Sequence, residues 1–436
     1  MSNDFDYGAD VQQAADVFKL WPREGTFTAL IDGDMIPYIV GYTTDLEDAN
    51  RAYRSVAKLL PDLAAFDMTH PLKFAALMET PEFNNKMQHA NFIVNDWVAK
   101  AGADSALIYL TTSANNYRNA IAFTKQYKGQ RESEKPPFFY EIKHYLATCH
   151  EAIIADGMEA DDLMSIEMWR RHRLVCGNEI PIGSEQHKVF SDCAIVSKDK
   201  DLRIVPGWNV EPDKGTKLWS DVIGELIPVW KTKEVKLYEQ WPTVKGEPVD
   251  PALKSFAGQY DTFASGKNKG EIKFKRAFIG MGEDQYIDKL KGSGLKFFYS
   301  QLITGDQVDN YPGIPGSGAK AAYELLQSCT TEEELFIAVR DAYKKALAGG
   351  SSEAIETENY RGGKAMLTPF QRMIEQGRLA HMQTYPGELW RAKNYCPTGE
   401  DEVWIVSSSK NREQALARSQ GQAHVGAERS LSAVSP

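Results

Sequence analysis

Three short apolar runs, each followed by polar or acidic residues, organise the first half of the chain. Residues 27–31, 106–110 and 194–196 are rich in side chains that favour β-strands. Helical patterns fill the intervals, most clearly over residues 91–100 and 160–171. Strands that alternate with helices are typical of a mostly parallel sheet, whose ligands lie beyond the carboxyl ends of the strands. The pattern therefore predicts an α/β fold with its chemistry at one edge of one sheet.

The second half of the chain changes character at about residue 230. Residues 230–294 have weak periodicity, several prolines and glycines, and a basic run over 267–276. Beyond them, helices are predicted over 297–303 and 319–327, on either side of a hairpin rich in glycine and proline. The expected division is a first domain over 1–229, an accessory insertion over 230–296, a helical subdomain over 297–396 and a mobile tail over 397–436.

Composition narrows the class of protein. The 436 residues carry a formal net charge of −10, which argues against a simple basic nucleic-acid binder. The five cysteines are scattered without a C-x-x-C pair, so the sequence predicts neither a zinc site nor a disulfide framework. The N-terminus lacks a basic region followed by an apolar run, and the chain has no long uninterrupted apolar stretch. We expect a cytoplasmic protein with no membrane association.

Acidic residues gather at the predicted strand ends, at one helix start and before the glycine-rich hairpin. In chain order they are Asp32, Asp34, Glu159, Asp161, Asp162, Asp199, Asp201, Asp306 and Asp309. Helix capping or a solvated turn would explain each small group alone. Together, oxygen ligands from several strand ends, without paired His or Cys, favour Mg²⁺ or Mn²⁺ over zinc. Two such ions about 4 Å apart can activate water and stabilise the leaving oxygen of a phosphodiester. The whole set predicts a two-metal site.

In this order the motifs resemble those of the flap endonuclease and 5′-nuclease superfamily, in particular the stand-alone bacteriophage 5′-3′ exonucleases. The resemblance runs from about residue 28 to 326, with a poorly matched stretch over 207–297. Asp32 matches the strand-end aspartate of the family, residues 159–162 its Glu-x-Asp-Asp helix, and residues 305–310 its Gly-Asp-x-x-Asp-Asn segment. The resemblance implies a PIN-like, mostly parallel twisted sheet flanked by helices, with a helical arch and a helix-hairpin-helix subdomain.

One position departs from the family pattern. The second strand of the family usually ends in an aspartate, whereas this chain has Thr111, Thr112 and Ser113. We expect either Asp34 or a water molecule held by Thr111 or Thr112 to take the place of that carboxylate.

The basic stretch after the second strand resembles the helical arch of the family, over about 112–145. Arg118 and Lys128 are expected to neutralise charge that develops on the scissile phosphate, and Tyr127 to stack on a base or sugar. Lys125 and Arg131 are expected to be further DNA contacts, although an ordinary solvated helix also explains Lys125.

The string that opens helix 319–327 resembles the helix-hairpin-helix element of the family, which grips a duplex phosphate and holds K⁺ with backbone carbonyls. The residues expected to contact DNA there are Gly313, Gly316, Ser317, Gly318 and Lys320. A plain turn between two helices is the alternative. The basic run over 267–276 is either a further duplex contact or a solvated loop.

The resemblance implies a metal-dependent 5′-3′ exonuclease or flap endonuclease with two Mg²⁺ or Mn²⁺ ions. Its expected partners are DNA with 5′ ends, flaps or junctions, RNA–DNA hybrids, and replication proteins that the sequence does not identify. A phage role in DNA replication, primer removal or DNA degradation, in the host cytoplasm, would follow. Two alternatives stay open: a branched-DNA-binding protein with a degraded site, suggested by the Thr111 departure, and a PIN-type ribonuclease, which leaves the hairpin unexplained.

Overall fold

A computed structural model describes residues 26–60, 70–111, 116–130 and 134–391. The predicted contact by Arg131, the predicted role of Thr112 and the predicted tail over 397–436 lie outside the described residues. The chain divides into two compact units, one made of Met1–Ile227 with Lys291–Pro436 and the other of Pro228–Leu290. No helix in the described ranges is long and apolar enough to cross a bilayer.

A six-stranded sheet of order β3-β2-β1-β4-β5-β6 forms the centre of the first unit. The strands are β1 (Thr28–Asp32), β2 (Ser105–Thr111), β3 (Ile153–Ala155), β4 (Cys193–Val196), β5 (Gly207–Glu211) and β6 (Thr216–Ser220). Neighbouring strands from β3 to β5 pair in parallel, and β6 is antiparallel to β5. The three predicted strands are confirmed as β1, β2 and β4. Because β1 lies between β2 and β4, the predicted convergence of their carboxyl ends is also confirmed.

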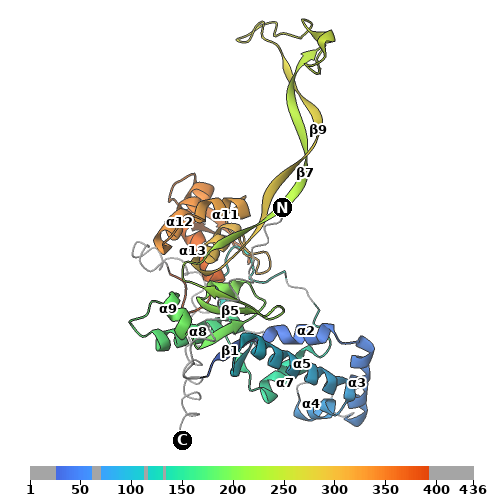
Figure 1. Cartoon of the computed structure of the whole chain (residues 1–436), viewed down its shortest axis with the longest axis vertical. Coiled ribbons are helices and arrows are strands. Elements are labelled where there is room, and N and C mark those ends of the chain that lie inside the picture. The colour runs from blue at the N-terminus through green and yellow to red at the C-terminus, as the bar shows by residue number, and fades with distance from the viewer. Residues whose placement is uncertain (1–25, 61–69, 112–115, 131–133, 392–436) are drawn as a thin grey trace. The chain divides into compact units, whose positions relative to one another are not determined.

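Helices cover both faces of this sheet. One face packs against α2 (Ile36–Tyr42), α3 (Leu46–Leu59), α4 (Pro71–Met78), α5 (Pro81–Ala101) and α7 (Phe139–Cys149), which Figure 1 shows gathered beside β1. The other face packs against α8 (Ala160–Cys176), followed by α9 (Glu185–Phe190). Successive strand residues serve opposite faces: Ile31 belongs to the first core and Leu30 to the second. The predicted α/β sheet flanked by helices is confirmed.

The segment predicted as an arch contains α6 (Arg118–Ile121) and most of α7. Between these two helices, the described residues form turns and irregular structure. A continuous helix would use its own carbonyls as acceptors. Instead, the N–H groups of Phe123 and Thr124 donate to the buried carboxylate of Glu375, at 2.9 and 2.8 Å. Two prolines, Pro136 and Pro137, then precede α7.

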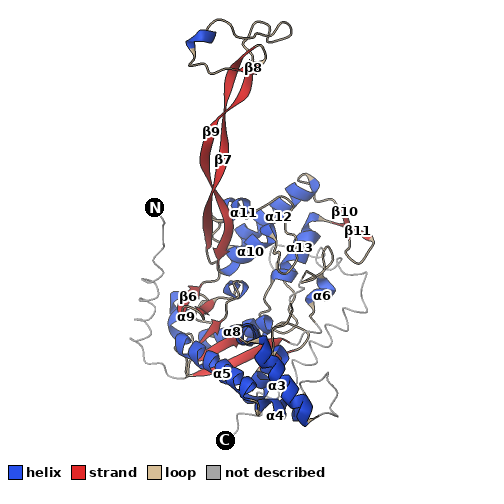
Figure 2. Cartoon of the chain, turned by 90° about the vertical axis from the view of Figure 1, so that its right-hand side faces the viewer, coloured by secondary structure: helices blue, strands red, loops and turns tan. Residues whose placement is uncertain are grey.

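The helical subdomain consists of α10 (Gly294–Thr304), α11 (Ala319–Leu326), α12 (Glu332–Ala348) and α13 (Pro369–Ala380), grouped together in Figure 2. A small hairpin, β10 (Ile355–Glu358) and β11 (Lys364–Leu367), precedes α13. Both helices predicted after the insertion are confirmed as α10 and α11. α13 contributes Met373 and Ile374, which are almost completely buried.

The second unit is a long β-ribbon whose main strands are β7 (Leu226–Val244) and β9 (Phe274–Gly292), each of 19 residues. β8 (Glu247–Pro248) adds a short antiparallel pairing to β7, and a 3-10 turn, η3 (Lys254–Phe256), follows it. Figure 1 shows β7 and β9 twisting about each other. The sequence analysis missed both strands because the apolar residues of a two-stranded ribbon need not alternate regularly when neither face is covered.

Candidate active site

The carboxyl ends of β1 and β4 carry the centre of the site. Asp32 is the last residue of β1 and is buried. Ser197, directly after β4, donates its hydroxyl to Asp32 Oδ2 at 2.8 Å and accepts from the N–H of Asp199 at 2.9 Å. The N–H of Asp201, which begins the 3-10 turn η2 (Asp201–Ile204), then donates to Asp199 Oδ1 at 2.8 Å. The turn after β4 is thus fastened to the end of β1 with two further carboxylates in place.

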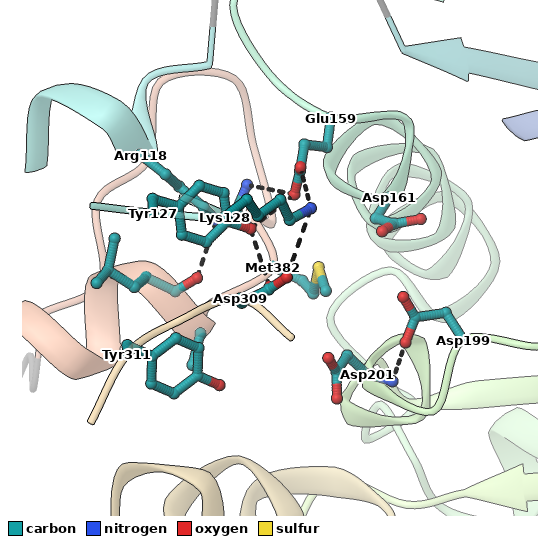
Figure 3. A pocket seen from close by; sticks show the side chains of 12 residues that line it. Arg118, Tyr127, Lys128, Glu159, Asp161, Asp199, Asp201, Asp309, Tyr311 and Met382 are labelled. Atoms are coloured by element: carbon teal, nitrogen blue, oxygen red, sulfur yellow. Dashed lines mark hydrogen bonds and ion pairs between the residues drawn. The ribbon is translucent and has the colours of Figure 1, made fainter. Parts of the chain in front are cut away.

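Asp161 joins these three carboxylates. We call the four residues, Asp32, Asp161, Asp199 and Asp201, the carboxylate cluster. Figure 3 shows Asp161, from the first turn of α8, and the turn of Asp199 and Asp201 on the same side of one pocket. Burial, followed by the charges of Asp34 and Asp199, raises the pKa of Asp32 to about 7. Burial and then the charges of Asp32 and Asp199 raise the pKa of Asp161 well above its ordinary value.

The cluster has little positive charge close to it. Burial, then the charge of Asp199, raises the pKa of Asp201 to about 7 even though Lys200 opposes the shift. The Nζ atom of Lys200 is 3.8 Å from Asp201, but it donates a hydrogen bond of 2.8 Å to Asp306 instead. Asp161 has no ion pair in the described part of the chain, and no dashed line reaches it in Figure 3. Buried carboxylates in this state need an external cation to remain ionised together.

The remaining acidic side chains of the predicted set near the pocket are paired with cations of the protein. Lys128 forms an ion pair with Glu159 and lies 3.7 Å from Asp309, while the hydroxyl of Tyr127 is 3.0 Å from each of these two carboxylates. Burial alone would raise the pKa of Glu159, but Lys128 and Arg118 outweigh it and hold that pKa below its ordinary value. We call Glu159, Asp162, Asp306 and Asp309 the paired carboxylates.

Arg118 and Asp162 are each other's main partners. Both are buried, and the guanidinium grips the two carboxylate oxygens of Asp162. The same guanidinium donates to the carbonyls of Leu379 and His381, at 2.9 and 2.7 Å. These contacts join α6 and α8 to the last turn of α13 and to the residue that follows the helix. The predicted roles, a phosphate contact for Arg118 and a metal ligand for Asp162, would require both groups to give up part of these interior contacts.

Asp34 and Thr111 are also engaged elsewhere. Asp34 forms an ion pair of 2.7 Å with Lys143 of α7 and accepts from the N–H of Thr111. The hydroxyl of Thr111 accepts from the N–H of Ala160 at 2.8 Å, so it caps α8. Asp34 does not line the pocket, and the Thr111 hydroxyl accepts a hydrogen bond from the first turn of α8. Neither arrangement supplies the carboxylate that the second strand lacks.

Asp306 binds Lys200 and accepts from the N–H groups of Val308 and Asp309, at 2.7 and 3.2 Å. Burial would raise its pKa, but Lys200 and these N–H groups hold it below the ordinary value. Asp306 therefore stabilises its own turn, and its charge raises the pKa of Asp201 in the cluster.

The pocket in Figure 3 brings together distant parts of the chain. It is lined by Arg118, Tyr127, Lys128, Glu159, Asp161, Asp199, Asp201, Asp309, Tyr311, Leu379, Ala380 and Met382. Sequence reasoning missed Tyr311 and also Leu379, Ala380 and Met382, which lie at the end of α13 and just after it. Tyr311 directly follows the Asp306–Asn310 string and could have been noticed. Nothing in the sequence indicates that residues 379–382 approach α8.

The residues predicted to contact DNA fall into two groups. Tyr127 is only 4% exposed and Gly313 is buried, with its N–H donated to Gln376 at 3.0 Å. A Cβ on Gly313 would lie 2.3 Å from the nitrogen of Gly305, so a close backbone approach requires glycine there. These two residues have interior roles. Residues that remain accessible for DNA contact are Lys125, Gly316, Ser317, Gly318 and Lys320.

The donor set suits a hard divalent cation, although its present geometry is not that of a finished metal site. Within the described residues, no group of three or more His, Cys, Asp and Glu side chains is arranged to hold a metal ion as it stands. The available donors are all oxygens, and their mutual repulsion is what a bound cation would relieve. The cluster residues would hold such ions after local side-chain adjustment.

No protein-family model and no curated protein matches this chain. The solved structures that are similar to this chain at low identity include three from bacteriophage T5. A T5 protein co-crystallised with metal ions has 10% identity and a TM-score of 0.32, and the match covers 81% of this chain and 99% of that chain. T5 5′-exonuclease with bound zinc has 12% identity and a TM-score of 0.31, with 72% of this chain and 88% of that chain covered. A T5 flap endonuclease in a pseudo-enzyme–product complex with DNA and metal ions has 12% identity and a TM-score of 0.31, with 74% and 94% of the two chains covered.

Proposed function

We propose that this chain is a nuclease that hydrolyses DNA phosphodiesters with the help of divalent metal ions, Mg²⁺ or Mn²⁺, bound at the carboxylate cluster. The observation that carries the proposal is the gathering of four carboxylates at one sheet edge, where burial and repulsion raise the pKa values of Asp32, Asp161 and Asp201. Such an arrangement costs stability in the metal-free protein, which is typical of a site built for function.

The cluster residues would hold two ions between β1, α8 and the turn after β4. When bound, such ions supply a deprotonated water as nucleophile and stabilise the leaving oxygen of the phosphodiester. Ser197 orients Asp32, and the backbone of the turn orients Asp199. Lys128 lines the pocket and pairs with Glu159. Its ammonium would turn partly from Glu159 to the bound phosphate and neutralise negative charge on that phosphate.

The substrate we propose is DNA with a 5′ end, a flap or a single-strand/duplex junction. The loop before α11 supports this, because Gly316, Gly318 and Lys320 are exposed and a helix N-terminus with free amides favours phosphate. Contacts of this kind position a duplex without reading its bases. The proposal extends to RNA in RNA–DNA hybrids, K⁺ at this loop, and a phage role in replication, primer removal or DNA degradation.

A cleavage assay tests the proposal. A 5′-labelled flap duplex and a blunt duplex are incubated with Mg²⁺, with Mn²⁺ and with EDTA. We expect metal-dependent products near the junction or the 5′ end, lost in Asp199→Ala and kept in Asp213→Ala, whose carboxylate pairs with Lys198 outside the pocket. Cleavage that survives both EDTA and Asp199→Ala would contradict the proposed site.

A second candidate function is binding of branched DNA without cleavage. Thr111 stands at the end of β2 without a carboxylate, and Lys143 neutralises Asp34, so the chain has fewer free acidic ligands than its motifs suggest. Tight junction binding with no product in either Mg²⁺ or Mn²⁺ would favour this candidate over the nuclease.

A further inference from the structure

The β-ribbon of the second unit has very little interior of its own. Most side chains of β7 and β9 are exposed, including Trp230 at 56% and Met281 at 54%. Cross-strand contacts hold the ribbon, such as the Lys231–Asp288 ion pair of 2.8 Å and the Lys233 ammonium 5.2 Å from the ring of Tyr286. Two-stranded ribbons are marginal in water. Large side chains left exposed on such a ribbon point to a binding partner.

One face of the ribbon presents aromatic rings around an arginine. Phe274, Arg276 and Phe278 alternate along β9 and therefore share a face. Tyr238 of β7 lies on that face, because the Arg276 guanidinium is 3.9 Å from its ring centre and the Phe278 ring is 5.9 Å away. Phe274, Phe278 and Tyr238 are 55%, 53% and 39% exposed. We call these four residues the aromatic face.

The tip of the ribbon is basic in a chain that is acidic overall. Residues 245–276 contain seven Lys and Arg and four Asp and Glu, a net charge of +3, whereas the whole chain carries −10. Asp261, one of those acids, accepts from the N–H groups of Lys245 and Gly246 and so holds the turn. Lys267 and Lys269 are exposed, with no carboxylate within ion-pair distance in the described residues.

We propose that the ribbon binds single-stranded nucleic acid, with bases stacked on the aromatic face and phosphates held by the lysines of the tip. The inference rests on the proposed function, since a flap or 5′ end supplies such a strand. Exposed rings beside cations are the combination that sequence-independent single-strand binders use. A duplex hides its base faces and would leave the rings unused. A protein partner would bury the rings but has no need of the unpaired lysines.

Binding of labelled oligonucleotides to the full chain tests this inference. Fluorescence anisotropy in EDTA, which prevents cleavage, compares an oligothymidine of about 20 nucleotides with a duplex of the same length. In Tyr238→Ala/Phe278→Ala, the single-strand Kd should rise about tenfold for each ring removed. Leu237→Ala/Ile279→Ala is the matched control, because both side chains are 42% exposed and adjoin the first pair on the opposite face. The control should change Kd less than twofold.

A second variant keeps the test sound if the ring variant loosens the ribbon. Lys267→Gln/Lys269→Gln alters two exposed loop side chains, and should reduce the slope of log K against log salt for the oligothymidine by about 1.4, at about 0.7 per phosphate contact. Unchanged single-strand affinity and salt slope in these variants would overturn the inference, and so would an equal loss of duplex affinity. Metal-dependent cleavage by the wild-type chain would still stand in either case.

Discussion

The carboxylate cluster and the paired carboxylates both contribute side chains to one pocket, but the two groups differ in what balances their charge. Asp161 and Asp162 are neighbours in the first turn of α8. Arg118 forms an ion pair with Asp162, while burial and then the charges of Asp32 and Asp199 raise the pKa of Asp161, and Lys128 opposes that rise only in part. An acidic motif therefore does not by itself identify metal ligands. The partner of each carboxylate decides whether it is part of the architecture or is left for a cation.

Substitution of Asp161 and of Asp162 should give the largest difference in activity and stability between the carboxylate cluster and the paired carboxylates. Asp161→Asn should lower the cleavage rate on the order of 10³-fold, because a metal ligand is lost. It should also raise the melting temperature of the metal-free protein by roughly 2 °C, because a repelled charge is removed. Asp162→Asn should instead lower the melting temperature, since Arg118 loses its partner. Cleavage assays measure the rate, and thermal denaturation in EDTA measures the melting temperature. Equal changes of melting temperature in the two variants would show that Asp161 and Asp162 do not differ in their charge balance.

Arg118→Met should cost about 3–5 kcal/mol of unfolding free energy, because it leaves the carboxylate of Asp162 buried and unpaired. The matched control is Arg170→Met, which removes a half-exposed partner of Glu167 and should cost about 1 kcal/mol or less. Urea denaturation gives both values. A small loss for Arg118→Met would show that this pair is not structural.

Lys128→Met should reduce cleavage about 10²-fold and should lower the melting temperature less than Arg118→Met does, because Arg118 still balances Glu159. The ammonium lies at the pocket wall between Glu159 and Asp309, where it can meet a phosphate. Lys125→Met changes an exposed lysine in the same turn and should affect cleavage less than about threefold. Similar losses of cleavage rate in the two variants would mean that cleavage depends on the positive charge of the segment rather than on the position of Lys128.

The pH dependence of stability gives a finer test. Burial lowers the pKa of His172 to about 4, and burial and then His172 lower that of His187 to about 3. The unfolded chain therefore binds more protons below about pH 6.5, and stability should fall with falling pH by at most about 1.4 kcal/mol per unit for each histidine. His187→Gln should flatten that decline.

The carboxylate cluster makes the stability of the protein depend on pH in the opposite direction. Folded Asp32 and Asp201 keep protons that the unfolded chain releases between pH 3.8 and about 7, so the metal-free protein should lose stability as pH rises through that window. Mg²⁺ should therefore raise the melting temperature more at pH 8 than at pH 5. Equal stabilisation at both pH values would contradict the proposed repulsion.

Much of the fold could be predicted from the sequence, because β1, β2 and β4 are continuous apolar runs with turn signals after them. α10 and α11 were also predictable, since a glycine and proline hairpin separates two periodic segments. β7 and β9 were not, because a solvated ribbon lacks the periodicity that a buried face imposes. Long-range pairing across the ribbon decides their structure.

The candidate site was only partly predictable. The positions of the acidic residues follow from strand ends and a helix start, and Asp32, Asp199 and Asp201 lie where that logic places them. Their division into two groups depends on Arg118, Lys128 and Lys200, whose contacts come from separate segments. The closure of the pocket by residues 379–382 depends on tertiary packing that no local pattern encodes.

Metal binding distinguishes the carboxylate cluster from the other acidic residues of the predicted set. Titration with Mn²⁺, followed by electron paramagnetic resonance of the free ion, counts bound ions in the wild-type chain, in Asp161→Asn and in Asp34→Ala. We expect two ions in the wild type, loss of at least one in Asp161→Asn, and unchanged binding in Asp34→Ala, because Lys143 already balances Asp34. Binding that is absent in the wild type, or that depends on Asp34 and not on Asp161, would contradict the account.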